Sequence, residues 1–292
     1  MKLREINVRD PFIYADEKSK KYYMYSSSPS NLVKGFCVYT STDLEEWSLP
    51  QTVFEANDEF WATKDFWAPE VHKYNDKFYL LGTFSSDERI RTSQILVADN
   101  LLGPFKVYSA PLAPQDWYAL DATLYVENDT PYSIFSHEWL QTKDGEMCVV
   151  ELAKDLSKPV SDTKVLFKAS ESKWAKSPKW HEGDEPIFVV DAPYVFEIDN
   201  VKFMLWSSWS TIEEDGYSVG VVYPQQNCGI LDGKYIHKLL KMPRNDCGHA
   251  MVFKDFNGRY RIALHENNSL CGKERAAIYY LQIKDGELIV YE

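Results

Sequence analysis

The sequence predicts an all-β fold: a five-bladed β-propeller with four antiparallel strands in each blade around a central channel. The first observation is a segment that recurs five times, in which a small or polar residue opens a run of β-branched and aromatic residues. The opening residues are 10, 68, 121, 191 and 249, so the steps are 58, 53, 70 and 58 residues, a period typical of propellers and other repeat folds. The second observation is that no segment sustains a period of 3.6 residues, so helix should be scarce.

Each repeat contains four strand-like runs separated by charged or glycine-containing turns. In the first repeat the predicted strands are residues 12–14, 22–25, 36–40 and 41–47. In the second repeat they are residues 71–74, 78–81, 95–98 and 103–107. Residues 3–8 are predicted to pair with a neighbouring strand edge and so close the ring.

Composition indicates a soluble globular chain, with 45% hydrophobic and 26% charged residues and no linker-like stretch. We therefore expect one domain over residues 1–292. The net charge of −12 argues against nucleic-acid or anionic-membrane partners, which require clustered Lys and Arg. No apolar run approaches the ~20 residues that span a bilayer, and residues 1–5 lack a signal-peptide core, so a cytoplasmic location is expected. Five scattered cysteines fit reduced thiols better than a disulfide or zinc framework.

The propeller geometry predicts where polar side chains gather. First strands of the blades line the channel and run the same way, so their openers share one rim. Each second strand returns to that rim, which brings the segments 136–139, 206–209 and 265–268 beside the openers. These strand ends combine polar and aromatic residues, a mixture typical of small-molecule sites.

Three of the five openers are carboxylates, namely Asp10, Asp121 and Asp191. A single Asp at a strand start usually caps a turn, but three at matching positions indicate a functional cluster. Like charges held close together raise one pKa. Glycoside hydrolysis uses this arrangement, since it needs one protonated carboxyl group as acid and one ionised carboxylate.

Five motifs carry a resemblance to a known family. They are Arg9-Asp10-Pro11-Phe12-Ile13, Ser41-Thr42-Asp43-Leu44-Glu45-Glu46-Trp47, Phe66-Trp67-Ala68-Pro69-Glu70-Val71, Ser136-His137-Glu138-Trp139 with Asp144-Gly145, and Cys247-Gly248-His249. Over nearly its whole length the chain resembles glycoside hydrolase family 43, whose members are five-bladed propellers and inverting exo- or endo-glycosidases acting on arabinose, xylose and galactose polymers. The resemblance implies that Asp10 is the general base and that Asp121 raises the pKa of the acid and orients it. It also implies that His249 is a channel histidine and metal candidate, near a structural calcium or sodium ion or a water, with no other cofactor required.

The proton donor departs from the family pattern, which has Glu in a Glu-Gly-Pro sequence. The matching segment here is Asp191-Ala192-Pro193, with a carboxyl group retracted by roughly 1.5 Å. Asp191 is favoured as the acid because it occupies the matching position, and Glu138 or Glu70 on the same rim is the alternative. A non-catalytic protein is the third possibility.

Several further residues are candidates for contacts with a sugar. Aromatic rings near the channel mouth can stack on a sugar, although such rings are as often packing residues. The substrate-binding candidates are Trp67, His137, Trp139, Trp206, Ser207, His265 and Arg275.

The predicted function is that of an inverting exo-glycosidase that releases terminal α-L-arabinofuranose from small neutral oligosaccharides. A β-xylosidase or a galactose- or galactofuranose-directed glycosidase is the alternative within the family; the absence of the β-sandwich that the resembling β-xylosidases usually append favours arabinofuranose. A sugar-binding propeller without turnover and an interaction scaffold are the alternatives of other classes. Exo-action rests on analogy, because loop conformations decide the depth of the pocket.

Overall fold

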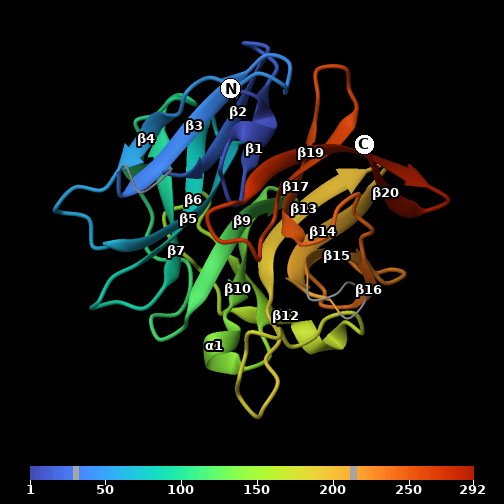
Figure 1. The fold of residues 1–292 in the computed structure, drawn as a ribbon. Coiled ribbons are helices and arrows are strands. Elements are labelled where there is room, and N and C mark those ends of the chain that lie inside the picture. Colours follow the sequence, from blue (N-terminus) through green and yellow to red (C-terminus); the bar gives the residue numbers. More distant parts are fainter. Residues whose placement is uncertain (29–32, 211–215) are drawn as a thin grey trace.

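The five-bladed propeller is confirmed by a computed structural model that describes residues 1–28, 33–210 and 216–292 (Figure 1). Each blade is an antiparallel sheet of four consecutive strands. Blade I comprises β1 (Phe12–Asp16), β2 (Lys21–Ser27), β3 (Gly35–Ser41) and β4 (Gln51–Glu55). Blade II comprises β5 (Lys64–Tyr74), β6 (Lys77–Ser85), β7 (Thr92–Ala98) and β8 (Lys106–Val107). Blade III comprises β9 (Ala119–Glu127), β10 (Thr130–His137), β11 (Glu146–Glu151) and β12 (Lys164–Lys168).

The remaining two blades repeat the same order. Blade IV comprises β13 (Asp191–Ile198), β14 (Val201–Trp209), β15 (Tyr217–Pro224) and β16 (Tyr235–Leu239). Blade V comprises β17 (Cys247–Lys254), β18 (Tyr260–Glu266), β19 (Arg275–Lys284) and β20 (Glu287–Tyr291). The first strands contact one another in the ring order β1, β5, β9, β13, β17 and back to β1. The first strands therefore surround the channel, as predicted.

Tight turns of Asn, Asp and Gly set the strand pairs. Two residues with positive φ connect β5 to β6 (Asn75-Asp76), β9 to β10 (Asn128-Asp129), β13 to β14 (Asp199-Asn200) and β19 to β20 (Asp285-Gly286). Such two-residue turns match the twist of antiparallel strands, and Asn, Asp and Gly tolerate positive φ best. Sequence-local chemistry thus accounts for four of the hairpins.

Helix is scarce, as the sequence predicts. Within the described ranges it is limited to α1 (Trp139–Thr142) and the 3-10 turns η1 (Leu3–Glu5) and η3 (Ala169–Glu171). None of these helices has the length or apolar character needed to cross a bilayer.

The amino-terminal segment joins the first and last blades, but not as a strand. Residues 3–5 form η1, and single antiparallel bridges link Lys2 to Glu46 and Asn7 to Arg275. Ile6 and Val8, on either side of Asn7, are buried. The predicted pairing of residues 3–8 with a neighbouring edge is thus limited to the bridge between Asn7 and Arg275 of β19, and the segment connects blade I with blade V.

The fourth strand of blade I was also misplaced. Residues 41–47 form a turn in which Oδ1 of Asp43 accepts hydrogen bonds from the backbone N–H groups of Glu45 and Glu46, each at 2.9 Å. Leu44 adopts a φ of 68° there. The outer strand is β4 instead, because the acidic side chain satisfies the backbone locally and ends the extended run.

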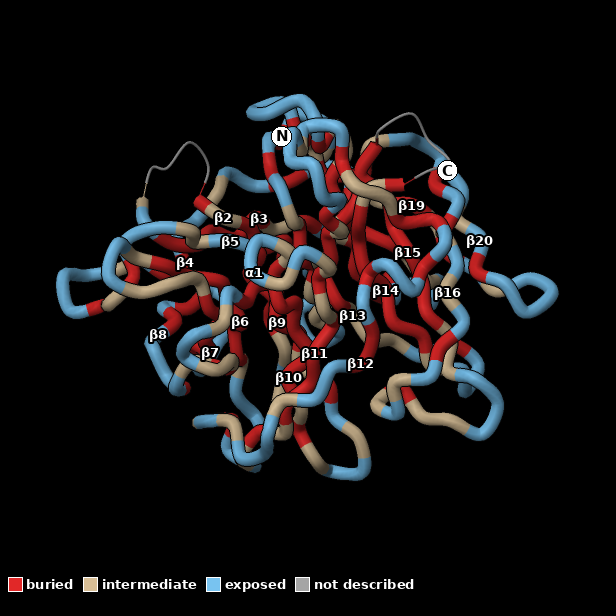
Figure 2. Tube along the Cα trace, turned by 90° about the horizontal axis from the view of Figure 1, so that it is seen from below, coloured by how far each residue is buried: buried red, intermediate tan, exposed pale blue. Residues whose placement is uncertain are grey.

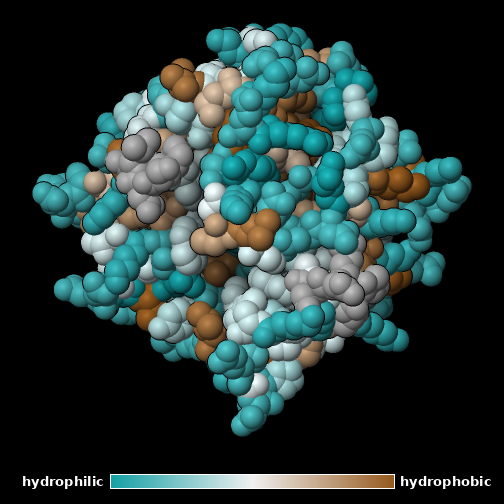
Figure 3. All heavy atoms as spheres, viewed as in Figure 1, coloured by the Kyte–Doolittle hydropathy of each residue, from teal (hydrophilic) through white to brown (hydrophobic). Residues whose placement is uncertain are grey.

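Burial follows the radial order of the strands. Inner and middle strands such as β9, β10 and β14 are largely buried, while outer strands and connecting loops are exposed (Figure 2). The face seen in Figure 3 is mostly hydrophilic with scattered apolar patches, as expected for an acidic chain. The apolar core therefore lies between the blades and leaves their rim polar.

Candidate active site

A backbone irregularity recurs at the start of every inner strand and builds the site. Asp10, Ala68, Asp121, Ala192 and His249 all have φ between 46° and 55°. In blades II to V the register of the first strand pair shifts beside this residue. Such bulges re-aim side chains, and positive φ is costly for residues other than Gly. This strain occurs once in each of the five blades, near the start of the inner strand.

The polar members of this set lie together. Nδ1 of His249 lies 3.0 Å from Oδ1 of Asp10 and 3.8 Å from Oδ2 of Asp121. Blades I, III and V thus place two carboxylates around one imidazole, while Ala68 and Ala192 fill the equivalent positions in blades II and IV.

Asp191 is not at the equivalent position. The residue with positive φ in blade IV is Ala192, so Asp191 precedes it by one and corresponds to Arg9 and Trp67. The prediction of three Asp residues at matching positions was wrong on this point. The cluster nevertheless includes Asp191, since the charge of Asp121 acts on it.

Electrostatics separate the members of the cluster. Burial works against ionisation of Asp10, but His249 and His265 outweigh it and hold the pKa of Asp10 well below its usual range. Burial likewise opposes the charged form of His249, yet the charges of Asp10 and Asp121 raise its pKa to about 9. At neutral pH the site therefore holds an ionised Asp10 beside a protonated His249.

Blade V positions Asp10. The backbone N–H of Asp10 lies 3.2 Å from Nδ1 of His265, whose Nε2 lies 3.0 Å from Oδ1 of Asn268. Arg9 donates to the same Oδ1 at 2.9 Å and pairs with Glu274 at 3.2 Å. This network fixes the strand start that carries Asp10.

Asp121 is the buried link between blades II, III and IV. Its backbone N–H donates to Oγ1 of Thr83 at 3.0 Å, and its Oδ2 accepts from the backbone N–H of Ala192 at 3.2 Å. Burial and the nearby charge of Asp10 raise the pKa of Asp121 to about 6, against the lowering effect of His249.

Asp191 has the character of a proton donor. Its Oδ2 accepts a hydrogen bond from the hydroxyl of Tyr217 at 3.0 Å, and its buried Oδ1 has no hydrogen-bond partner among the described residues. Burial and the charge of Asp121 raise the pKa of Asp191 well above its ordinary value. A protonated carboxyl group with one free oxygen can donate a proton to a bound ligand.

The two alternative acids have different surroundings. Glu138 is 0% exposed, and its Oε1 accepts from Arg91 at 2.6 Å while Oε2 has no partner in the described chain. Burial raises the pKa of Glu138 although Arg91 opposes this. Glu70 lies two residues further along β5 than the bulge and contacts Nε2 of His72 at 3.0 Å. Its carboxylate is thus held by a neighbouring side chain.

Among the predicted substrate contacts, Trp67 has the most accessible ring. It is 40% exposed, and the guanidinium of Arg91 lies 4.3 Å from its ring centroid. Trp139 is partly buried at the start of α1. Arg275 donates to the carbonyl oxygen of Glu274 at 2.7 Å.

Four of the predicted substrate contacts have buried side chains that are engaged with other protein groups. Trp206 is 0% exposed and packs against Phe167 and Trp174 in the core. His137 stacks on Trp117 at 3.9 Å, and its ring nitrogens contact Glu146 and Gln141.

Ser207 and His265 contact residues of the carboxylate cluster. Ser207 accepts the backbone N–H of His249 at 3.0 Å, and His265 holds Asp10. Both are fully buried and contact the cluster from the protein side.

Sequence reasoning missed Tyr217, Thr83 and Arg91. Tyr217 begins β15 and Thr83 lies within β6, and neither occurs in a recognisable motif. Arg91 directly precedes β7, so its position at a strand start on this rim was the one signal available.

The described residues contain one group of three side chains with metal-ligand atoms within 4.8 Å of one another, His137, Glu146 and Cys148. Lys168 pairs with Glu146 at 3.0 Å, and the thiol of Cys148 has a raised pKa because it is buried. A lysine and a protonated thiol both oppose cation binding. This group therefore packs as an ion-paired cluster.

Comparison with known proteins agrees with this geometry. Residues 4–286 match the family described as glycosyl hydrolases family 43. An endo-arabinase from Bacteroides thetaiotaomicron is 36% identical, with 98% of each chain covered and a TM-score of 0.89. A thermostable family-43 glycoside hydrolase is 25% identical, with 98% of this chain and 93% of that chain covered and a TM-score of 0.80.

An α-L-arabinofuranosidase from Lactobacillus brevis has a TM-score of 0.74 over 99% of this chain and 97% of its own, but at 15% identity this likeness shows the fold alone. No curated protein sequence matches the chain. The family assignment rests on the match over residues 4–286 and on the similarity to the endo-arabinase. The chain belongs to glycoside hydrolase family 43 and is a glycosidase.

Proposed function

We propose that this glycosidase hydrolyses α-L-arabinofuranosyl linkages in neutral oligosaccharides with inversion at the anomeric carbon. The observation that carries the proposal is the division of the carboxyl groups in one buried cluster, with the pKa of Asp10 lowered and that of Asp191 raised. One group is then ionised and the other protonated at the same pH, as an acid and base pair requires.

In this proposal Asp10 acts as the general base. Its carboxylate takes a proton from a water molecule whose oxygen attacks the anomeric carbon. His249 and His265 keep the carboxylate ionised and fixed, since both lie within 3.2 Å of Oδ1.

Asp191 acts as the general acid. As the glycosidic C–O bond breaks, its proton passes to the leaving oxygen, so Asp10 ends protonated and Asp191 ionised until both exchange protons with solvent. Asp121 keeps Asp191 protonated beforehand through its charge and holds the next residue by the bond to Ala192.

Arabinofuranose is proposed because the relative at 36% identity is described as an endo-arabinase. Release of terminal residues stays a prediction, and cleavage within a chain is the second candidate because of that same relative. The length of the first products distinguishes exo- from endo-cleavage, because exo-cleavage releases monosaccharide from the start of the reaction.

The channel ion implied by the family stays a prediction. A metal ligand must be a neutral imidazole, whereas Asp10 and Asp121 favour the protonated form of His249. The residues around His249 thus do not fit a metal centre well, and no step of the proposal passes through an ion.

The test is hydrolysis of a panel of arabino-, xylo- and galacto-oligosaccharides together with the matching aryl glycosides. We expect arabinose substrates to have the highest kcat/KM and the first product to carry the inverted anomeric configuration by proton NMR. Preference for xylo- or galacto-oligosaccharides, or retention of configuration, would contradict the proposal.

A further inference from the structure

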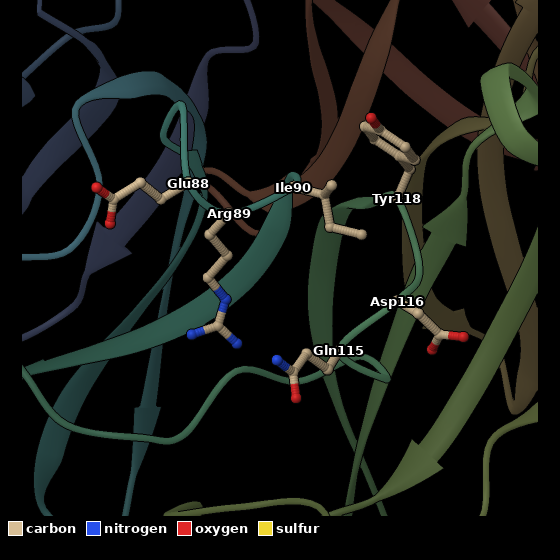
Figure 4. Close-up of a pocket in the computed structure, with 6 residues that line it drawn as sticks. All are labelled: Glu88, Arg89, Ile90, Gln115, Asp116 and Tyr118. Atoms are coloured by element: carbon tan, nitrogen blue, oxygen red, sulfur yellow. The ribbon is translucent and has the colours of Figure 1, made fainter.

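A surface hollow lies on the active rim between blades II and III. It has a volume of about 670 Å³, within the range usual for ligand pockets. The lining residues come from the β6–β7 loop and from the segment before β9, and are Glu88, Arg89, Ile90, Gln115, Asp116 and Tyr118 (Figure 4). Both segments adjoin strand ends at the channel mouth, since β6 ends at Ser85 and β9 begins at Ala119.

The side chains in the hollow combine apolar and hydrogen-bonding groups. The head groups of Arg89 and Gln115 point toward one another, Ile90 lies between Arg89 and Tyr118, and Glu88 and Asp116 point away (Figure 4). Sugars present an apolar C–H face and a rim of hydroxyl groups, so an aromatic ring beside amide and guanidinium donors suits them. Tyr118 is 37% exposed and so offers its ring to a ligand.

The hollow is held in place before any ligand binds. The guanidinium of Arg89 lies 4.9 Å from the ring centroid of Trp61, and its backbone N–H donates to Oγ of Ser86. Tyr118 donates its backbone N–H to Gln141 at 3.0 Å and accepts from the backbone N–H of Glu138 at 2.8 Å. A preformed site loses less entropy when it binds a ligand.

A smaller hollow of about 270 Å³ adjoins this site. It shares Glu88, Arg89, Ile90 and Tyr118 with the first hollow and also includes Asp65, Ser85 and Arg91. Arg91 contacts Trp67 and pairs with the fully buried Glu138. The charge of Glu138 acts on both Asp121 and Asp191.

Two residues that contact Arg91, beside the smaller hollow, have features that suit a ligand. Oε2 of Glu138 is buried without a hydrogen-bond partner among the described residues, and an unpaired buried oxygen is costly unless a ligand pairs with it. Trp67 occupies in blade II the position that Asp191 occupies in blade IV, and its ring is exposed. Arg91 thus links Glu138 and Trp67 to the hollow that Tyr118 lines.

We infer that the hollow between blades II and III is a distal binding site for the extension of a neutral saccharide chain whose scissile bond lies at the carboxylate cluster. The inference rests on the proposed function for the identity of the chain. Anionic chains are disfavoured, because Asp65, Asp87, Glu88 and Asp116 line the two hollows while Arg91 is already paired.

The first experiment compares long and short substrates. The measured quantity is kcat/KM for arabino-oligosaccharides of six or more units divided by kcat/KM for an aryl arabinofuranoside. Tyr118→Ala and Arg89→Ala should each lower this ratio by about tenfold, mainly because KM for the long substrate rises. Tyr291→Ala and Arg4→Ala are matched controls, since both residues are exposed and lie in blade V and at the amino terminus. An unchanged ratio in both rim variants would overturn the inference.

The second experiment measures binding without turnover. In an Asp10→Asn background, calorimetry with arabino-oligosaccharides should show affinity that increases with chain length, and adding Tyr118→Ala should abolish that increase. Affinity independent of Tyr118 and Arg89 at every length would overturn the distal site while leaving the proposed function intact. If the panel shows cleavage of xylo- or galacto-oligosaccharides instead, the proposed function fails, and the same titration with those chains supports or overturns the distal site separately.

Discussion

Oδ2 of Asp121 accepts a hydrogen bond from the backbone N–H of Ala192 at 3.2 Å, and so joins blade III to the residue that follows Asp191. The bond holds two acidic side chains from different blades close enough for the charge of one to raise the pKa of the other. Position and pKa of the candidate acid therefore depend on the same contact.

Replacing Asp121 tests this dependence. Asp121→Asn keeps an oxygen for Ala192 but removes the negative charge, so the pKa of Asp191 should fall and the acid should lose its proton at lower pH. We expect the alkaline limb of the kcat/KM profile to move to lower pH and the maximum rate to fall by roughly 10²-fold. Asp76→Asn, in an exposed turn, is the control. An alkaline limb at the wild-type position would show that Asp121 does not tune the acid.

Asp10→Asn should separate binding from turnover. The amide has the shape of the carboxylate but cannot take a proton from water, so kcat should fall by roughly 10²- to 10⁴-fold. Calorimetry with an oligosaccharide should find a Kd within a few fold of the wild-type value. Loss of binding together with activity would instead assign Asp10 a positioning role.

Much of the site was predictable because the repeat exposes equivalent positions in the sequence. Asp10, Asp121 and His249 lie near strand starts at similar spacing, and the structure places both carboxylates within 4 Å of Nδ1 of His249. Strand count, hairpin turns and the scarcity of helix followed from the same pattern and from Asn, Asp and Gly chemistry.

The errors came from features that periodicity does not encode. A bulge inserts residues between pairing positions, so the sequence does not show that positive φ falls on Ala192 and not on Asp191. Trp206 and Ser207 are neighbours on β14 that point to opposite faces, one into the core and one toward His249. Which face reaches the channel depends on blade packing, which a single sequence does not specify.

His249 should couple stability to pH. Its pKa rises from 6.5 to about 9 in the folded protein, which corresponds to stabilisation on the order of 3 kcal/mol. Because the folded pKa is the higher one, this contribution is fully present below pH 6.5 and is lost as the pH rises through about 9. His249→Asn, which tolerates positive φ, should therefore destabilise the protein more at pH 7 than at pH 10 in urea unfolding. An equal loss of unfolding free energy at both pH values would mean that the His249 ring is neutral in the folded protein.

Asp191→Ala should reveal the acid by its dependence on the leaving group. Natural oligosaccharides leave as poorly stabilised alkoxides and need a proton, so their kcat/KM should fall by roughly 10²- to 10⁴-fold, whereas aryl glycosides with acidic phenols should lose far less. Glu138→Gln is the matched comparison, because Glu138 is also buried, has a raised pKa and has one oxygen without a partner.

The two variants distinguish the candidate acids because their partners differ. Tyr217 donates to Asp191 and leaves the other oxygen free, whereas Arg91 pairs with Glu138 and favours its ionised form. We therefore expect Glu138→Gln to reduce activity on aryl and natural substrates by similar factors. Activity of wild type should also decline on the alkaline side as Asp191 loses its proton, and this limb should disappear in Asp191→Ala with an activated aryl glycoside. If the leaving-group contrast occurs in Glu138→Gln instead, Glu138 is the acid, and the carboxyl group of Asp191 binds a sugar hydroxyl.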